Sequence, residues 1–224
     1  MTTYEQVYQL ASDNYGIVTV EAAQQLGIHR KEMLNWTRMG RLDKCGRGVY
    51  RITHYAPTEY DRYAEALALV GGDAMIYGDG VLAMHNLALV NPPAITVACS
   101  RRVRRKLPSW VKVVPKPEGV SVDNFNGIAT QTVEGAVRTC KGAVMSDRLL
   151  DAVEEAERNG FVDSKAAERL KKELGRDEVA VPSPLRLPKE AAVAACCGER
   201  SRMGSSLCRS ARQYRGRGAS SPVG

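Results

Sequence analysis

The sequence predicts an α+β protein with an N-terminal winged helix-turn-helix, a small mixed α/β domain and a disordered basic tail. Near the start, two helical segments flank a glycine turn, and a hairpin with a basic, glycine-rich tip follows the second of them. Short β-branched runs then alternate with helical periodicity. The last segment shifts to Arg, Gly, Ser and Pro. The expected domains are residues 1–57, 58–178 and 179–224.

The first two helices are predicted from their caps and apolar spacing. Thr2 or Thr3 can cap a helix that runs to about residue 13, and Thr19 can cap the next one. Gly27 then makes the turn into a third helix. The side chains expected to face the core of this region are Val7, Leu10, Ala11, Val20, Ala23, Leu26 and Ile28.

The third helix and the hairpin complete the predicted first domain. Residues 29–39 form a basic helix that Gly40 ends. Residues 41–52 predict two strands around a tip where Gly46 and Gly48 allow positive φ angles. The buried stripe should continue through Met33, Trp36 or Thr37, and Leu42.

The second domain is predicted to begin after Pro57 with a helix over residues 59–70, whose buried stripe is Tyr63, Leu67 and Val70. Ser146 should cap a later amphipathic helix, and Asp163 or Ser164 the last one. Strands are expected at residues 74–77, 94–99, 110–114 and 128–130, and further helices at 81–87, 133–144, 147–159 and 164–174.

The net charge of +7 lies mostly in the predicted tail, which has eight Arg and Lys residues but only two Glu residues from Ser183 onward. This tail is too polar to bury enough surface to offset its ordering entropy, so we expect disorder. The rest of the chain is nearly neutral, and a hypothesis of nucleic-acid binding must therefore rest on local clusters.

The polar side of the third helix is the first such cluster. In a winged helix this segment lies in the DNA major groove, where Arg reads guanine and Asn reads adenine. The candidate base-reading residues are Arg30, Lys31, Asn35 and Arg38. Candidates for phosphate contact are His29, Lys44 and Arg47, the last two on a mobile tip.

A second cluster is the basic run of residues 101–106, with Arg101, Arg102, Arg104, Arg105 and Lys106 and no acid to balance them. A solvated loop is the default interpretation of such a run. The functional alternatives, held equal, are a second patch that clamps the DNA backbone and a docking site for an acidic or RNA-containing partner.

No catalytic or metal-binding constellation is evident. The three histidines have no nearby nucleophile and orienting acid, and the six cysteines form no CxxC pair. Scattered cysteines are typical of the reducing cytosol, no N-terminal signal is visible, and no apolar run approaches the roughly 18 residues of a membrane helix. We expect a cytoplasmic protein that is not an enzyme, has no cofactor or metal, and binds no membrane.

Several segments carry a family resemblance. Residues 22–28 (AAQQLGI), 40–42 (GRL) and 46–51 (GRGVYR) form an N-terminal pattern, residues 76–87 (IYGDGVLAMHNL) run from a strand into a small helix, and residues 93–97 (PAITV) precede the basic run. Together they resemble the AbiEi-like antitoxins, which are the abortive-infection transcriptional regulators of type IV toxin–antitoxin pairs.

The resemblance implies a winged helix that represses the operon's own promoter, commonly at inverted repeats. It also implies a C-terminal domain that counters a nucleotidyltransferase-like toxin without a stable complex. Dimeric or cooperative binding would suit inverted half-sites. The positions carried over from the family are Arg30, Lys31, Asn35, Arg38, Lys44 and Arg47.

Two function classes follow from these observations. The leading hypothesis is a sequence-specific DNA-binding repressor that is the antitoxin of a type IV operon. The alternative is a protein- or RNA-interaction module without specific DNA readout, in which the winged helix is a docking scaffold or the basic run binds the partner.

Overall fold

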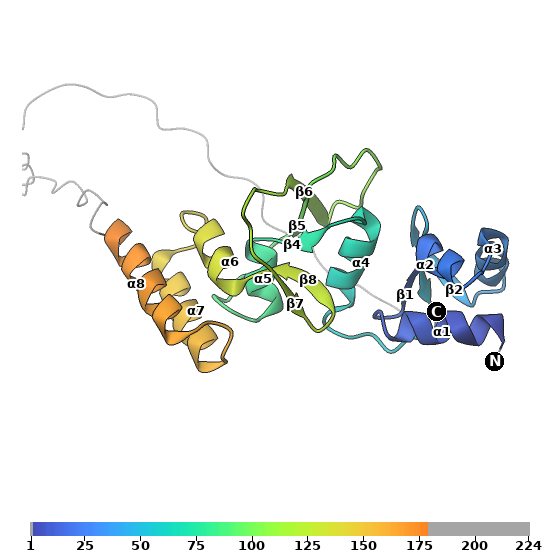
Figure 1. Cartoon of the computed structure of the whole chain (residues 1–224), viewed down its shortest axis with the longest axis horizontal. Coiled ribbons are helices and arrows are strands. Elements are labelled where there is room, and N and C mark those ends of the chain that lie inside the picture. The colour runs from blue at the N-terminus through green and yellow to red at the C-terminus, as the bar shows by residue number, and fades with distance from the viewer. Residues whose placement is uncertain (1, 179–224) are drawn as a thin grey trace, which may run out of the picture. The chain divides into compact units, whose positions relative to one another are not determined.

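The first elements along the chain are three helices and a small antiparallel sheet (Figure 1). The computed structural model describes residues 2–178, so the predicted disordered tail, residues 179–224, lies outside the described residues. The helices are α1 (Thr3–Ser12), α2 (Val20–Gln25) and α3 (Arg30–Arg38). The sheet has the order β1-β3-β2, with β1 (Ile17–Thr19), β2 (Leu42–Gly46) and β3 (Val49–Ile52).

Threonines begin two of these helices, as predicted. The hydroxyl of Thr2 accepts a hydrogen bond from the amide of Glu5, whose carboxylate accepts one from the amide of Thr2. This capping box satisfies amides that the first turn of α1 leaves unpaired. The hydroxyl of Thr19 accepts a bond from the amide of Ala22. Strand β1 was not predicted, because its three residues end at the cap of α2 and are too few to show an alternating pattern.

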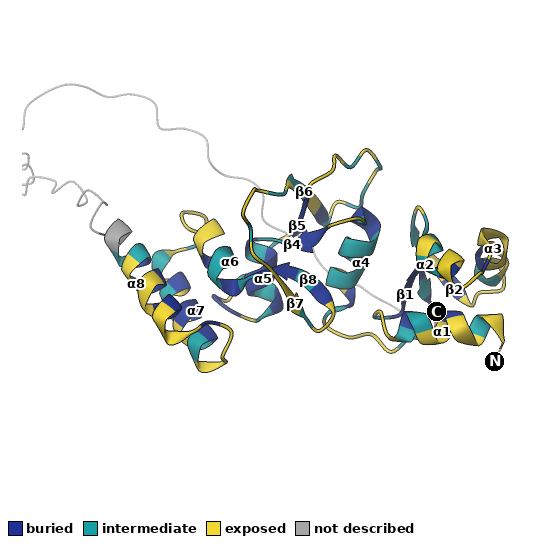
Figure 2. Cartoon of the chain, in the orientation of Figure 1, coloured by how far each residue is buried: buried dark blue, intermediate teal, exposed yellow. Residues whose placement is uncertain are grey.

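One apolar cluster joins these elements, and outward-facing residues of α1, α2 and α3 remain exposed around it (Figure 2). The prediction was wrong for Leu26, which is 45% exposed at the C-terminal end of α2. Ile28 fills the core as predicted, because Gly27 turns the chain inward with a φ of 73°. Leu10 is only partly buried. The buried members are Val7, Ala11, Val18, Ala23, Ile28, Met33, Leu42, Tyr50 and Ile52.

The second sheet is mixed and has the order β6-β5-β4-β8-β7. Its strands are β4 (Met75–Ile76), β5 (Ile95–Cys99), β6 (Val111–Pro115), β7 (Val122–Phe125) and β8 (Ile128–Gln131). The β5–β6 and β4–β8 pairs are parallel, and the β4–β5 and β7–β8 pairs are antiparallel. Strand β7 was not predicted, because it is an edge strand of mostly exposed residues without apolar alternation.

Helices α4 (Asp61–Val70) and α5 (Asp79–Met84) pack against β5, and α6 (Val133–Thr139) packs against α5. The stripe predicted for α4 was partly wrong, since Tyr63 and Leu67 are only half-buried. Helix α4 also contacts β1 and β2 of the first sheet, so its buried surface does not follow a single stripe. Its buried apolar side chains are Ala66, Leu69 and Val70.

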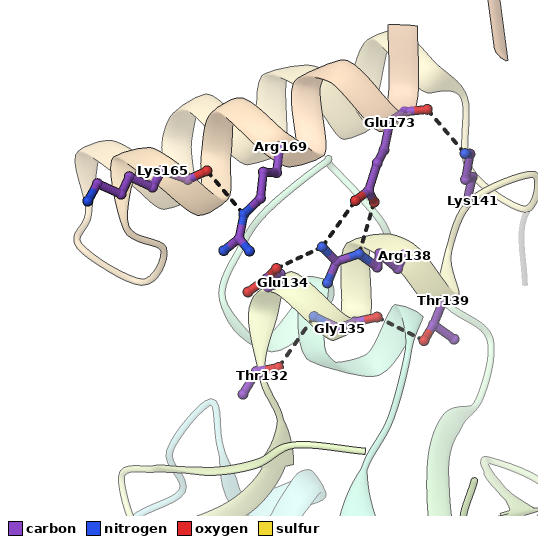
Figure 3. Close-up of polar contacts among 9 residues, drawn as sticks. All are labelled: Thr132, Glu134, Gly135, Arg138, Thr139, Lys141, Lys165, Arg169 and Glu173. Carbon is purple, nitrogen blue, oxygen red and sulfur yellow. Dashed lines mark hydrogen bonds and ion pairs between the residues drawn. The ribbon is translucent and has the colours of Figure 1, made fainter. Parts of the chain in front are cut away.

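The last two helices, α7 (Ser146–Arg158) and α8 (Ser164–Glu178), pack against each other. An ionic contact ties α8 to α6, as Figure 3 shows. The guanidinium of Arg138 pairs with Glu134 at 2.8 Å and with Glu173 at 2.9 Å. The buried side chains of the two helices include Leu149, Ala152, Val153, Ala156, Ala167, Leu170 and Leu174.

The start of α7 corrects one predicted cap. Ser146 is the first residue of the helix, and the N-cap is Met145, which makes no side-chain capping bond. The apolar spacing located the helix correctly, although the capping residue was wrong. Within residues 2–178, no helix is long and apolar enough to span a membrane.

His85 lies in an aromatic cluster that joins the end of α5 to β7 and to the turn after α7. Its ring centroid is 4.2 Å from that of Phe125 and 4.6 Å from that of Phe161. Its Nδ1 atom is buried without a hydrogen-bond partner in the described part of the chain. Burial lowers the pKa of His85, and the charge of Asp123 opposes that shift.

We expect the stability of the protein to fall as the pH drops below about 6.5, the ordinary pKa of histidine. Below this pH His85 is protonated in the unfolded chain but stays neutral in the folded chain, which favours unfolding. The contribution of neutral His85 to the free energy of unfolding is therefore complete above this pH and is lost as the pH falls below it. In urea unfolding between about pH 7.5 and about pH 5.5, His85→Phe should flatten this fall. His54→Phe, at an exposed site, should not. An unchanged pH dependence in His85→Phe would contradict the assignment.

Candidate nucleic-acid interface

Helix α3 turns a polar face away from the core. Met33 is fully buried, which directs the opposite side of the helix outward. Lys31, Asn35 and Arg38 are exposed and share that side, because they are four and three residues apart. Leu34 lies among them and is 37% exposed. Leu34 was not predicted for this face, although its position three residues after Lys31 is the signal that assigns it there.

His29 and Arg30 lie at the N-terminal end of α3. His29 is the N-cap, and its Nδ1 atom accepts a hydrogen bond of 3.5 Å from the amide of Lys31. Arg30 is the first helical residue and lines a groove together with Arg47. The structure therefore separates Arg30 from the three other candidates on the outward face of α3.

The hairpin β2–β3 turns through Arg47 and Gly48, and Gly48 has a φ of 79°. Lys44 is exposed but lies within β2, opposite Tyr50, so the prediction that it occupies the tip was wrong. Gly46 does not have a positive φ, so the prediction that both tip glycines adopt one was correct for Gly48 and wrong for Gly46. A Cβ atom at Gly46 would clash with Cδ2 of Leu69, so this glycine allows α4 to approach the hairpin.

Helix α4 holds the hairpin in place. Nη2 of Arg51 in β3 pairs with Oε2 of Glu65 in α4 at 2.9 Å. Cys45 is half-buried beside them, and burial, followed by the charge of Glu65, raises the pKa of its thiol to about 11. Ile17 and Val49 pack into the same core cluster as the residues of α4. The first sheet and α4 thus form one packed body.

A basic groove of about 490 Å³ lies between the hairpin turn and the loop that joins β5 to β6. Within the described chain, Glu21 is the one acidic residue on its lining. No ion pair or hydrogen bond among residues 2–178 engages the guanidinium groups of Arg30, Arg47, Arg104 and Arg105. We call this site the arginine groove; its basic lining consists of Arg30, Arg47, Arg101, Arg104 and Arg105.

The groove divides the basic run that the sequence analysis singled out, residues 101–106. Arg101, Arg104 and Arg105 line the groove, whereas Arg102 and Lys106 are exposed outside that lining. The structure therefore brings three members of the second cluster next to Arg47 and Arg30 of the first. In the described residues, no group of three or more His, Cys, Asp or Glu side chains could hold a metal ion.

The comparisons with known proteins concern the region that contains α3 and the hairpin. Residues 5–53 match the family described as "Transcriptional regulator, AbiEi antitoxin". The AbiEi match starts within α1 and ends just after β3, so the resemblance inferred from the sequence is confirmed there. No curated protein matches the chain. Among solved structures, the chain is similar to the RV2827C protein from Mycobacterium tuberculosis, with a TM-score of 0.43, 16% identity and 78% of each chain covered.

Proposed function

We propose that the chain is a sequence-specific DNA-binding transcriptional repressor whose residues 1–57 form a winged helix-turn-helix. The observation that carries this proposal is that the exposed polar face of α3 and the basic hairpin turn both lie in the segment that matches the AbiEi transcriptional regulators. A helix of this kind docks in the major groove while the hairpin contacts the neighbouring backbone.

Base reading is assigned to the outward face of α3. Asn35 pairs with adenine, and Lys31 and Arg38 pair with guanine. Leu34 supplies an apolar contact for a thymine methyl group on the same face. Arg30, a base-reading candidate from the sequence, also lines the arginine groove and is equally suited to a phosphate.

Phosphate binding is assigned to the arginine groove and to two exposed residues outside its lining, His29 and Lys44. The positively charged guanidinium groups that line the groove repel one another, and a bound polyanion offsets this repulsion. A cleft lined by charges of one sign also concentrates the electrostatic potential that attracts the polyanion. Arg47 in the hairpin turn and Arg104 and Arg105 in the loop offer guanidinium groups on this lining that no described side chain pairs with. These contacts strengthen binding to any duplex without reading its sequence.

The biological role that we propose is the antitoxin of a type IV toxin–antitoxin operon, in line with the description of the matched family. The chain binds inverted repeats in its own promoter as a dimer or cooperatively, and residues 58–178 counter a nucleotidyltransferase-like toxin without a stable complex. We assign it to the cytoplasm and give it no catalytic residue, metal or cofactor.

A second candidate is an RNA- or protein-binding module that uses the same groove without reading DNA sequence. The unpaired arginines favour it too, since phosphate and carboxylate groups both pair with guanidinium. Competition separates the candidates: duplex DNA from upstream of the gene should displace RNA or an acidic protein from a repressor, but not from such a module.

The experiment measures binding of Asn35→Ala and Lys44→Ala to the upstream DNA and to duplexes with single base-pair changes. Asn35→Ala should cost about 1–3 kcal/mol and lose discrimination at one base pair. Lys44→Ala should weaken all sequences alike and lower the salt slope by about one. Arg30→Ala is measured in the same assay. Lost discrimination at one base pair would assign Arg30 to base reading, and equal losses on all sequences would assign it to phosphate contact. Uniform losses in both Asn35→Ala and Lys44→Ala would contradict base reading by α3.

A further inference from the structure

Arg101 differs from the other arginines of the groove because its guanidinium already has a partner. Its Nη2 atom donates a hydrogen bond of 3.2 Å to the backbone oxygen of Val70, the last residue of α4. The last carbonyls of a helix lack intrahelical partners, and a cation near them also interacts favourably with the helix dipole. Arg101 thus caps α4 from a distant loop.

Two glycines after α4 make room for this contact. Gly71 and Gly72 have φ angles of 65° and 73°, so both suit residues without a Cβ atom. A Cβ atom at Gly72 would lie 2.8 Å from Nε and 2.9 Å from Cζ of Arg101. One at Gly71 would lie 3.1 Å from Nη2 of the same side chain. The guanidinium therefore rests directly on the glycine pair, Gly71 and Gly72.

Asp73 fixes the beginning of the same loop. Its carboxylate accepts hydrogen bonds of 3.3 Å from the amide of Ser100 and from Sγ of Cys99. Hydrogen bonding from the side chain of Ser100, followed by that from Cys99, lowers the pKa of Asp73 to about 2, and the amide of Ser100 adds a smaller contribution. Residues 99–101 are therefore tied to the segment that leaves α4.

Helix α4 consequently determines both sides of the arginine groove. It holds the hairpin that carries Arg47 through the pair of Arg51 with Glu65. At its C-terminal end it holds Arg101, which begins the run that carries Arg104 and Arg105. The distance across the groove depends on one rigid helix between its two sides.

We propose that Arg101 is a positioning residue for phosphate binding: resting on Gly71 and Gly72, it holds the loop so that Arg104 and Arg105 line the groove beside Arg47 and bind phosphates of one DNA duplex. This inference rests on the proposed DNA-binding function. It assigns the glycine pair a role in binding although neither glycine bears a charge or needs to touch DNA.

The test is Gly72→Ala in the full chain, because this change displaces Arg101 without removing a charge. The measurement is the salt dependence of the affinity for the upstream duplex. The slope should fall by about 1.8, which corresponds to two lost phosphate contacts, as it should in Arg104→Ala/Arg105→Ala. Gly119→Ala is the matched control, since Gly119 has a φ of 74° and no atom within 4 Å of an added Cβ, and its slope should equal that of the wild type.

The possible outcomes separate the two proposals. If the wild-type chain does not prefer the upstream DNA to a scrambled duplex, the proposed function fails, and if its affinity for DNA also does not depend on salt, this inference fails with it. If the wild type binds and Arg104→Ala/Arg105→Ala lowers the slope, but Gly72→Ala behaves like Gly119→Ala, only the positioning role of Arg101 is overturned.

A second pair of variants covers the case in which Gly72→Ala does not fold. Arg101→Ala and Arg102→Ala each remove one charge from the same loop, but of these two described side chains Arg101 is the one that hydrogen-bonds to α4. Arg101→Ala should lower the salt slope by more than the roughly 0.9 of a single phosphate contact. Equal slopes in Arg101→Ala and Arg102→Ala would overturn the inference.

Discussion

Replacing Met33 with alanine is expected to lower the free energy of unfolding by about 2–5 kcal/mol. Met33 is the one residue of α3 that is buried, and its side chain is 0% exposed. Its loss would leave a cavity among Val7, Ile28 and Tyr50 of the same cluster, which backbone elements on several sides prevent from collapsing. The measurement is urea unfolding, followed by the fluorescence of the two tryptophans, of which Trp36 lies in the same helix.

Met39→Ala is the matched control for this prediction. Met39 is the C-cap of the same helix and is 68% exposed, so its truncation removes the same atoms without making a cavity. We expect a change within about 0.5 kcal/mol. Equal destabilisation by the two substitutions would show that Met33 does not anchor α3 to the core.

The second large effect is expected for Arg104→Ala/Arg105→Ala. If each guanidinium neutralises one phosphate, the slope of log affinity against log salt falls by about 1.8. That change corresponds to a loss of roughly 60-fold in affinity at about 0.1 M salt. Because phosphates carry no sequence information, the loss should be the same for upstream and scrambled duplexes.

Arg102→Ala/Lys106→Ala is the control that removes the same number of charges from the same loop. Both side chains are exposed and lie outside the lining of the groove. Their loss should change the slope by clearly less than the first double variant does. Identical slopes in the two double variants would mean that the loop acts through its total charge, and the assignment of phosphate contacts to the groove would be wrong.

The elements within residues 1–57 could be predicted because their signals are local. Thr19 predicts the start of α2, Gly27 predicts the turn after it, and the apolar spacing around Met33 predicts α3. The two strands that were not predicted also have local reasons for it. Strand β1 has three residues and strand β7 is polar, so neither shows the alternation by which a strand is found in a sequence.

The arginine groove could not be predicted as a whole, because it depends on contacts between distant segments. The sequence identified Arg47 and the basic run of residues 101–106 as separate clusters. Their proximity follows from the packing of α4 on the hairpin, where Gly46 meets Leu69. No pattern in the sequence distinguishes Arg101 from Arg102, since the difference is the carbonyl of Val70 that Arg101 reaches in the folded chain.

The same limit applies to the face of α3. Leu26, which was predicted to face the core, is exposed after α2, and Leu34, for which no position was predicted, lies outward with Lys31 and Asn35. A helix as short as α3 can bury few side chains in the core, and Met33 is the residue of α3 that is buried there. The face of α3 to which we assign base reading therefore consists of side chains that the core leaves exposed.

The most direct test of the central claim is a salt-titrated mobility shift of the full chain with the DNA upstream of its gene and with a scrambled duplex. We predict tight binding that prefers the upstream DNA, with a preference that Asn35→Ala reduces and a salt slope that Arg104→Ala/Arg105→Ala lowers. Weak binding that is equal on both duplexes would contradict the claim that α3 reads DNA sequence.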